Sequence, residues 1–284
     1  MLSTCVKSNT AFVKFIGWYR VTDGNVSELS CVCIVDVYCV TQLHDVVYML
    51  GMMSSTILRF NATTHERLTD ITIRGLIMSS DIVACEQTSQ LYVADFQCVR
   101  RMSADGAVIK VLLSNSSSDM FRPSSLSVAS SRLLVTSHDT KELIQLDSLG
   151  DELRRFQLPD HMEPWNAVES PTATFIVSHK NTQLDQYEIS EVNADCQVLR
   201  QFTGSRLSPL RFTPYIAIDS RGNLFVAGNH RILLLDAQLK LRRLITDKHQ
   251  FSFKQPRRLC YGEQTGQLLV GLEYTVAVFD VLHR

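Results

Sequence analysis

Three histidines follow short apolar runs at corresponding places in the chain, and cations and aromatic residues lie near them. His138 stands in Ser-His-Asp-Thr, His179 in Ser-His-Lys-Asn and His230 in Asn-His-Arg. Cationic side chains pair with phosphates or carboxylates, and aromatic rings stack on bases or on apolar side chains. We therefore expect a binding face for a protein or peptide, with a single-stranded RNA as the other candidate ligand. This face comprises Arg122, His138, Trp165, His179, Lys180, Tyr215, His230, Arg231 and Arg257.

A second set of residues has the chemistry of a metal site. Asp36, Asp81 and Asn166 stand near the starts of apolar runs, and carboxylate and amide oxygens are the ligands that Ca²⁺ prefers. If those runs converge, the three side chains meet. The corresponding places in three other runs hold Ser125, Tyr215 and Arg258. A guanidinium at the last of these places would repel a bound cation.

The elements that must position these residues belong to a sequence repeat. The segment Glu86–Val93 (EQTSQLYV) recurs almost unchanged as Glu263–Val270 (EQTGQLLV), 177 residues further on. Related apolar runs occur at spacings of 42 to 49 residues. They begin at Val47, Leu91, Leu133, Phe175, Leu224 and Leu268. Six units of this length have the period of a four-stranded propeller blade.

Each unit shows the same order of short strands and turns. In the fifth unit, an apolar strand at Ile216–Ile218 precedes the turn Asp219–Asn223, and two more apolar strands and a polar strand follow. Few windows hold the apolar spacing of a helix. The sequence predicts an all-β, six-bladed β-propeller of four-stranded antiparallel blades, with residues 1–284 as a single domain. The expected blades span about 34–76, 77–122, 123–163, 164–212, 213–255 and 256–284.

The two ends of the chain predict how the ring closes. The sixth unit ends at Val281 and Leu282 without a fourth strand, whereas the lead-in at residues 1–33 contains a spare strand at Phe12–Ile16. Pairing the two would remove open sheet edges, which invite association with other chains. We therefore expect the N-terminal strand to complete the sixth blade.

Basic residues recur on the predicted fourth strands. Charged side chains on an exposed edge strand oppose pairing with other sheets, and this is the role that we expect for them. A perimeter surface for an acidic partner is the alternative. The residues are Arg67, Lys110, Arg154, Arg155, Arg200, Arg242 and Arg243.

The fifth unit, Pro214–Asp236, resembles an NHL repeat, and Leu91–Asp95 (LYVAD) is similar to the second strand of that repeat. The resemblance extends over roughly residues 34–282. It implies an interaction platform for proteins or RNA, as in the C-terminal domain of tripartite-motif proteins, although no RING or B-box motif is present. Related six-bladed folds include calcium-dependent lactonases. The alternative function is therefore a lactonase-like hydrolase that uses Asp36, Asp81 and Asn166 in the central channel.

Composition and cysteine spacing bear on location and partners. A net charge of −1 and 45% apolar residues indicate no general attraction to nucleic acids or membranes. The N-terminus has no secretory pattern, and no apolar run is long enough to span a bilayer. None of the eight cysteines forms a CxxC pair, so we expect buried thiols in a cytoplasmic protein. We also expect no cofactor and a non-enzymatic scaffold function.

Overall fold

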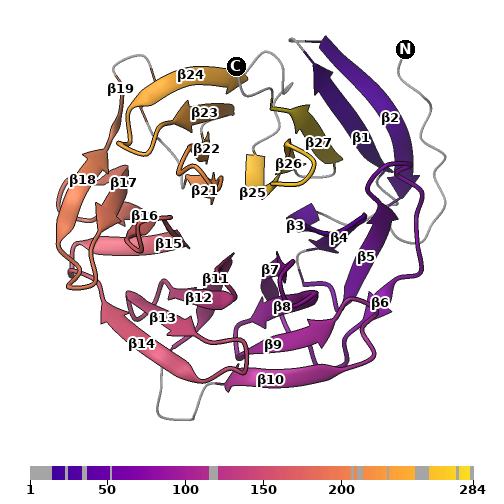
Figure 1. Ribbon diagram of the computed structural model, residues 1–284, viewed down its shortest axis with the longest axis horizontal. Coiled ribbons are helices and arrows are strands. Elements are labelled where there is room, and N and C mark those ends of the chain that lie inside the picture. The colour runs from indigo at the N-terminus through magenta and orange to yellow at the C-terminus, as the bar shows by residue number, and fades with distance from the viewer. Residues whose placement is uncertain are drawn as a thin grey trace.

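The computed structural model describes residues 15–22, 25–33, 37–51, 53–114, 121–205, 208–209, 214–228, 230–246, 256–272 and 275–281. These residues form six blade sheets around a central axis and one additional two-stranded sheet, and Figure 1 shows the resulting ring. The predicted six-bladed, all-β propeller is confirmed. Within these ranges every regular element is a strand, so no helix there has the length and apolarity that a membrane crossing needs.

Five blades consist of four antiparallel strands in chain order, from the axis to the perimeter (Figure 1). Blade one contains β3 (Val37–Leu43), β4 (Val46–Gly51), β5 (Thr56–Asn61) and β6 (Ile71–Thr72). Blade two contains β7 (Ser79–Cys85), β8 (Gln90–Asp95), β9 (Cys98–Ser103) and β10 (Ile109–Ser114). Blade three contains β11 (Pro123–Ala129), β12 (Arg132–Ser137), β13 (Glu142–Leu146) and β14 (Glu152–Gln157). Blade four contains β15 (Met162–Glu169), β16 (Phe175–Asn181), β17 (Gln186–Val192) and β18 (Val198–Phe202). Blade five contains β21 (Tyr215–Ile218), β22 (Leu224–Gly228), β23 (Arg231–Leu235) and β24 (Leu241–Thr246), after a short hairpin of β19 (Gly204–Ser205) and β20 (Ser208–Pro209).

Burial explains the composition of the strands. The second strand of a blade packs against neighbouring blades on both faces, so β8 and β12 are almost wholly buried and read as continuous apolar runs. The outer strands β10, β14, β18 and β24 are mostly exposed, and each carries one or two basic residues beside apolar ones. Turn chemistry reverses the chain between strands. Asp219, for example, accepts the amides of Arg221 and Asn223 at 3.0 and 2.7 Å around Gly222, whose φ is +83°.

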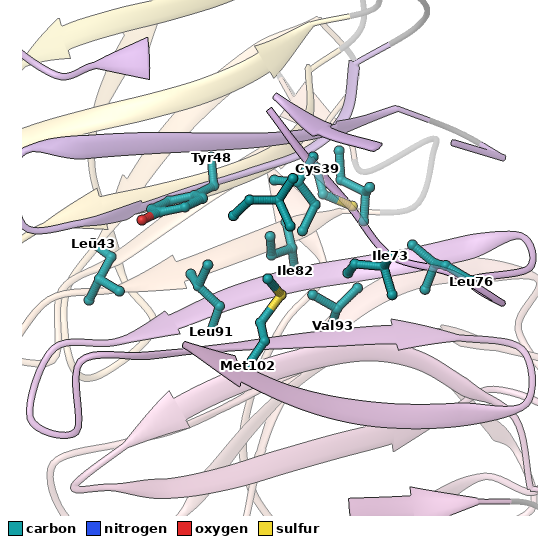
Figure 2. Packing of buried hydrophobic residues seen from close by; sticks show 12 residues of the cluster. Cys39, Leu43, Tyr48, Ile73, Leu76, Ile82, Leu91, Val93 and Met102 are labelled. Carbon is teal, nitrogen blue, oxygen red and sulfur yellow. The ribbon is translucent and has the colours of Figure 1, made fainter. Parts of the chain in front are cut away.

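The hydrophobic core consists of six clusters, one at each interface between adjacent blades. Figure 2 shows the cluster between blades one and two, where Tyr48 of β4 meets Ile82 of β7, Leu91 of β8 and Met102 of β9. The Tyr48 hydroxyl donates a hydrogen bond to the carbonyl of Ala104 at 3.0 Å. Each blade therefore buries both faces only because it has a neighbour on each side.

Cys39, Cys85, Cys98, Cys196 and Cys260 are free thiols. Cys39, Cys85 and Cys98 are buried as expected, whereas Cys196 and Cys260 are half-buried. Burial raises the pKa of Cys98 to about 11, so this thiol stays protonated and unreactive at neutral pH.

The N-terminal segment completes blade six, as predicted, but with two strands rather than one. The sheet order is β2–β1–β27–β26–β25, with β25 (Pro256–Gly262), β26 (Gln267–Leu272) and β27 (Thr275–Asp280) from the C-terminal end. Strand β1 (Phe15–Thr22) pairs with β27 in parallel, and β2 (Asn25–Cys33) covers its outer edge. The predicted strand at Phe12–Ile16 overlaps β1 by two residues, and residues 12–14 lie outside the described part. The residues that pair with β27 are Trp18–Val21, which lie beyond the predicted span, because contact with β27 and not local hydrophobicity selects them.

Ring closure through β1 can be tested with proline. Arg20 pairs with Val278 in the middle of the β1–β27 contact. Arg20→Pro removes a backbone donor from the middle of β1, which pairs with β27 on one side and β2 on the other. We therefore expect the free energy of unfolding to fall by about 1–3 kcal/mol in urea denaturation. Arg20→Ala keeps the backbone donor and serves as the control. Equal stabilities of the proline and alanine variants would contradict closure through β1.

Candidate functional site

Near the start of each inner strand, one residue directs its side chain into the central channel, and in most of these strands it follows a β-bulge. The strand register shifts just before this residue in five of the six inner strands, and β21 has a residue at the corresponding position. The six residues are Cys39, Asp81, Ser125, Asn166, Tyr215 and Arg258. They form the channel ring, and Arg258 borders a cavity on either side of it.

The two cavities open toward opposite ends of the propeller. The turn-face cavity, of about 630 Å³, lies among the turns that join first and second strands. The loop-face cavity, of about 220 Å³, lies among the loops between second and third strands and the connections between blades. The latter is the face on which the binding residues were predicted.

The centre of the channel ring is a buried ion pair between blades two and six. Arg258 Nη2 lies 2.9 Å from Asp81 Oδ2, and both side chains are almost inaccessible to water. The same carboxylate oxygen accepts the amide of Leu126 at 2.7 Å. Arg258 also donates to the carbonyls of Ser80 and Ser124, at 3.4 and 3.2 Å. Burial alone would lower the pKa of Arg258, but Asp81 and the other groups around the guanidinium together raise it. Burial also raises the pKa of Asp81, although Arg258 and the amides of Leu126 and Ile82 oppose that shift.

This arrangement does not fit the alternative calcium site. Asp81 faces the guanidinium of Arg258, whose positive charge repels a bound cation, as expected from the sequence. Asn166 Oδ1 accepts the amide of Ile216 at 3.1 Å, and its Nδ2 donates to Ser125 Oγ at 2.6 Å. Asp36 lies outside the described residues. Within the described ranges, no three His, Cys, Asp or Glu side chains form a group that could hold a metal ion.

The loop-face cavity combines an apolar rim with aromatic walls. Met53, Met78 and Phe96 are 65%, 37% and 39% exposed, although their side chains are large and apolar. Trp165 and Tyr215 form walls, and the Arg258 guanidinium lies 5.0 Å from the centre of the Tyr215 ring. The full lining is Tyr38, Met53, Met78, Ser79, Ser80, Phe96, Arg122, Pro123, Ser124, His138, Asp139, Trp165, Tyr215 and Arg258.

A buried carboxylate at the end of β8 holds two of the rim loops. Asp95 Oδ1 accepts the amides of Gln97 and Cys98, each at 2.8 Å, and its Oδ2 accepts the amide of Ile77 at 3.3 Å. Arg100 completes this set with an ion pair at 2.5 Å. Burial alone would raise the pKa of Asp95, but these hydrogen bonds outweigh burial and hold the pKa below its usual value. Asp95 thus fixes the loops that present Phe96 and Met78.

The third blade positions the polar side of the cavity. The His138 ring lies against Trp165 with centroids 4.4 Å apart, and His138 Nδ1 is 3.2 Å from the carbonyl of Pro164. Arg122 contacts Asp139 at 3.6 Å, and both side chains are more than one third exposed. An exposed pair of that geometry contributes less than about 1 kcal/mol. Arg122 is therefore available to a ligand.

The structure brings together four of the nine predicted binding residues, namely Arg122, His138, Trp165 and Tyr215. The placement of His179 on this face was wrong. The side chain is 1% exposed because strand alternation in β16 turns it toward blade three. Its Nε2 lies 2.9 Å from Ser190 Oγ, on the adjacent strand β17 of the same blade.

The other four predicted residues do not border the cavity. Lys180 pairs with Asp185 at 2.6 Å. His230, Arg231 and Arg257 are half-buried and outside the lining. Sequence reasoning missed the apolar rim, although its signal is visible as large apolar residues in short connections. Met53 and Met78 even adopt left-handed backbone conformations, with φ of 60° and 54°, which favour small or polar residues.

The basic residues on the outer strands are largely paired with nearby acids. Arg67, which was predicted on a fourth strand, precedes β6 and contacts Asp70 at 2.6 Å. Arg200 of β18 contacts Glu191 at 2.6 Å. Arg242 lies 3.1 Å from Asp236. This pairing accords with the expected protection of sheet edges better than with an acidic partner, and that role stays a prediction.

The buried ion pair can be tested by a double-mutant cycle. Arg258→Met leaves the Asp81 carboxylate buried without a counter-charge, so we expect a loss of about 3–5 kcal/mol in the free energy of unfolding. Asp81→Asn should also destabilise, but the double variant should lose less than the sum of the two. Urea denaturation of the four proteins measures the coupling. Losses that add within about 0.5 kcal/mol would show that the pair is not coupled.

His179 predicts an acid-sensitive stability. Burial lowers the pKa of His179 from 6.5 to about 4, despite the neighbouring Glu188. The unfolded chain therefore binds a proton at higher pH than the folded one, and stability falls as the pH drops from 6.5 to about 4. The full loss is about 3 kcal/mol at 1.36 kcal/mol per pKa unit. Urea midpoints across this range should show a shallower pH dependence for His179→Gln than for the parent chain. Identical slopes would refute a neutral buried His179.

Known proteins resemble this chain in structure rather than in sequence. No protein-family model matches the chain, and no curated protein matches it. A catalytically inactive virginiamycin B lyase from Staphylococcus aureus, solved with quinupristin, is 12% identical with a TM-score of 0.63, covering 94% of this chain and 98% of its own. A Bacteroides caccae protein of unknown function is 13% identical with a TM-score of 0.61, covering 82% of this chain and 98% of its own.

A third similar structure is the WD40 domain of Neurospora crassa Pan2. It is 9% identical with a TM-score of 0.56, covering 87% of this chain and 80% of its own. At such identities the likeness shows the fold alone, and the resemblance to NHL repeats stays a prediction. The chain is similar to β-propellers of several kinds.

Proposed function

We propose that this chain is an interaction scaffold that binds a protein or peptide at the loop-face cavity. The observation that carries the proposal is the exposed apolar rim of Met53, Met78 and Phe96 around a cavity with aromatic walls. Large apolar side chains grouped on a surface and bordered by polar groups are typical of interaction sites. Methionine suits such a surface because its flexible thioether adapts to different partners.

The architecture supports this use. Rigid sheets that present loops at one mouth are a common arrangement for recognition, because the sheets fix the loops without taking part in contacts. A WD40 domain shares the fold at low identity, which is compatible with an interaction role but does not identify a partner.

A peptide suits the rim better than RNA does. The aliphatic side chains of Met53 and Met78 offer no aromatic face for stacking bases. Several cations near this face are engaged already, since Lys180 pairs with Asp185 and Lys141 Nζ donates to the carbonyl of Asp160 at 2.5 Å. The metal-dependent hydrolase is not favoured, because Asp81 and Asn166 are held by protein partners.

A library of random dodecapeptides displayed on phage provides the test. Peptides selected on the parent chain should bind a Met53→Ser/Phe96→Ser variant at least about tenfold more weakly, because the apolar contact is lost. Leu153→Ser/Val198→Ser removes apolar residues of similar exposure, 47% and 46%, from the outer strands and is the matched control. Binding should be retained by the control.

Peptides that bind the parent and the rim variant equally would contradict the proposal, as would peptides that depend on Leu153 and Val198. A mixed-sequence single-stranded RNA is tested in parallel. Its retention by the parent chain, with loss in the rim variant and weakening by salt, would replace the peptide with RNA as the ligand.

A further inference from the structure

The polar groups that border the loop-face cavity differ in whether they have a hydrogen-bond partner. Trp165 Nε1 and Arg258 Nε are buried donors, and neither finds an acceptor among the residues that the structure describes. Arg258 is 7% exposed, so its unmet donor is shielded from bulk water. A buried polar group without a partner is costly. Both atoms are also closed to a ligand in this conformation, so that cost belongs to the chain itself.

The backbone acceptors beside the cavity are already engaged. The carbonyl of Pro123 accepts Ser80 Oγ at 2.9 Å, and the carbonyl of Pro164 lies 3.2 Å from His138 Nδ1. The carbonyl of Ser124 accepts Arg258 Nη2 at 3.2 Å. A ligand that brought more donors would therefore compete for these occupied acceptors.

Arg122 adds a cation at the same mouth. Its side chain is 55% exposed, and its contact with Asp139 is long at 3.6 Å. A carboxylate placed opposite the guanidinium can take two parallel hydrogen bonds, which the present contact does not provide. Asp139 is the competitor for this cation, so removing its charge should favour an external carboxylate.

The cavity also has room for an apolar side chain. A water molecule accounts for about 30 Å³ of liquid, so a volume of about 220 Å³ accommodates one large side chain. Met53, Met78 and Phe96 surround its entrance, and Arg122 lies at the same entrance. A ligand with an apolar group next to an acceptor would therefore contact both parts of this entrance.

We propose that the partner recognised here is a peptide segment that carries an acidic side chain next to a large apolar one. The apolar side chain enters the loop-face cavity, and the carboxylate pairs with Arg122. This inference rests on the proposed function and names the chemistry of its partner. The peptide has the apolar group that Met53 and Met78 require, which an RNA backbone lacks.

The experiment uses three heptapeptides with blocked ends and a fluorescein label, built in Gly-Ser frames. Their central pairs are Glu-Phe, Gln-Phe and Glu-Gly, so the carboxylate and the apolar group are removed one at a time. Blocked ends exclude capture of a terminal carboxylate. Fluorescence anisotropy measures affinity for the full chain, and the indole N–H signal of Trp165, assigned with Trp165→Phe, reports on the cavity up to millimolar peptide.

We expect the Glu-Phe peptide to bind about fivefold more tightly than the Gln-Phe peptide and to shift the Trp165 signal. Arg122→Gln should abolish this preference by weakening the Glu-Phe peptide alone. Asp139→Asn should tighten the Glu-Phe peptide about two- to threefold, because Arg122 loses its competitor. Arg67→Gln, at an exposed arginine on the perimeter, is the matched control and should change nothing.

The outcomes separate this inference from the proposed function. If the library yields rim-dependent peptides but Glu-Phe and Gln-Phe bind alike, the acidic preference is wrong and the scaffold function stands. The same holds if Arg122→Gln leaves the preference intact, or if none of the three heptapeptides binds. If the library also yields no rim-dependent peptide, both proposals fail. Since Arg122 and Asp139 are exposed, matching melting temperatures of the variants and the parent will show that folding is unaffected.

Discussion

Inner strands of a propeller leave one backbone edge facing the channel, and buried backbone donors must find partners. In this chain the partners are side chains from neighbouring blades. Asp81 of blade two accepts the amide of Leu126 in blade three, and Asn166 of blade four accepts the amide of Ile216 in blade five. Arg258 then joins blade six to blade two through Asp81. The ring depends on these links because the hydrophobic clusters connect adjacent blades only.

The same links shape both ends of the channel. In the channel ring, the carboxylate, amide and guanidinium are held by protein partners. At the loop face, Asp95 holds the connections that carry Phe96 and Met78. A rigid centre with an apolar entrance suits the binding of a peptide, since little conformational entropy of the protein is lost on contact.

Strand periodicity and repeat spacing were sufficient to predict six blades, because each blade must bury two faces and turn at regular intervals. The site was predicted less well. Trp165 and Tyr215 border the cavity as expected, but His179 points into an interface between blades, and the rim residues Met53 and Met78 were not anticipated. A polar side chain at the end of a buried strand can point to either face of its sheet. The local sequence pattern does not determine which of the two faces a neighbouring blade covers.

The sequence by itself determined the fold class, the number of blades and the use of the N-terminal segment to close the ring. These follow from local periodicity and from counting strands. Only the tertiary structure decided that Asp81 pairs with Arg258, 177 residues away, and that Arg122 shares a cavity with Phe96 and Trp165. Such contacts depend on how blades rotate and where bulges fall, because side chains distant in sequence meet only after the ring has closed.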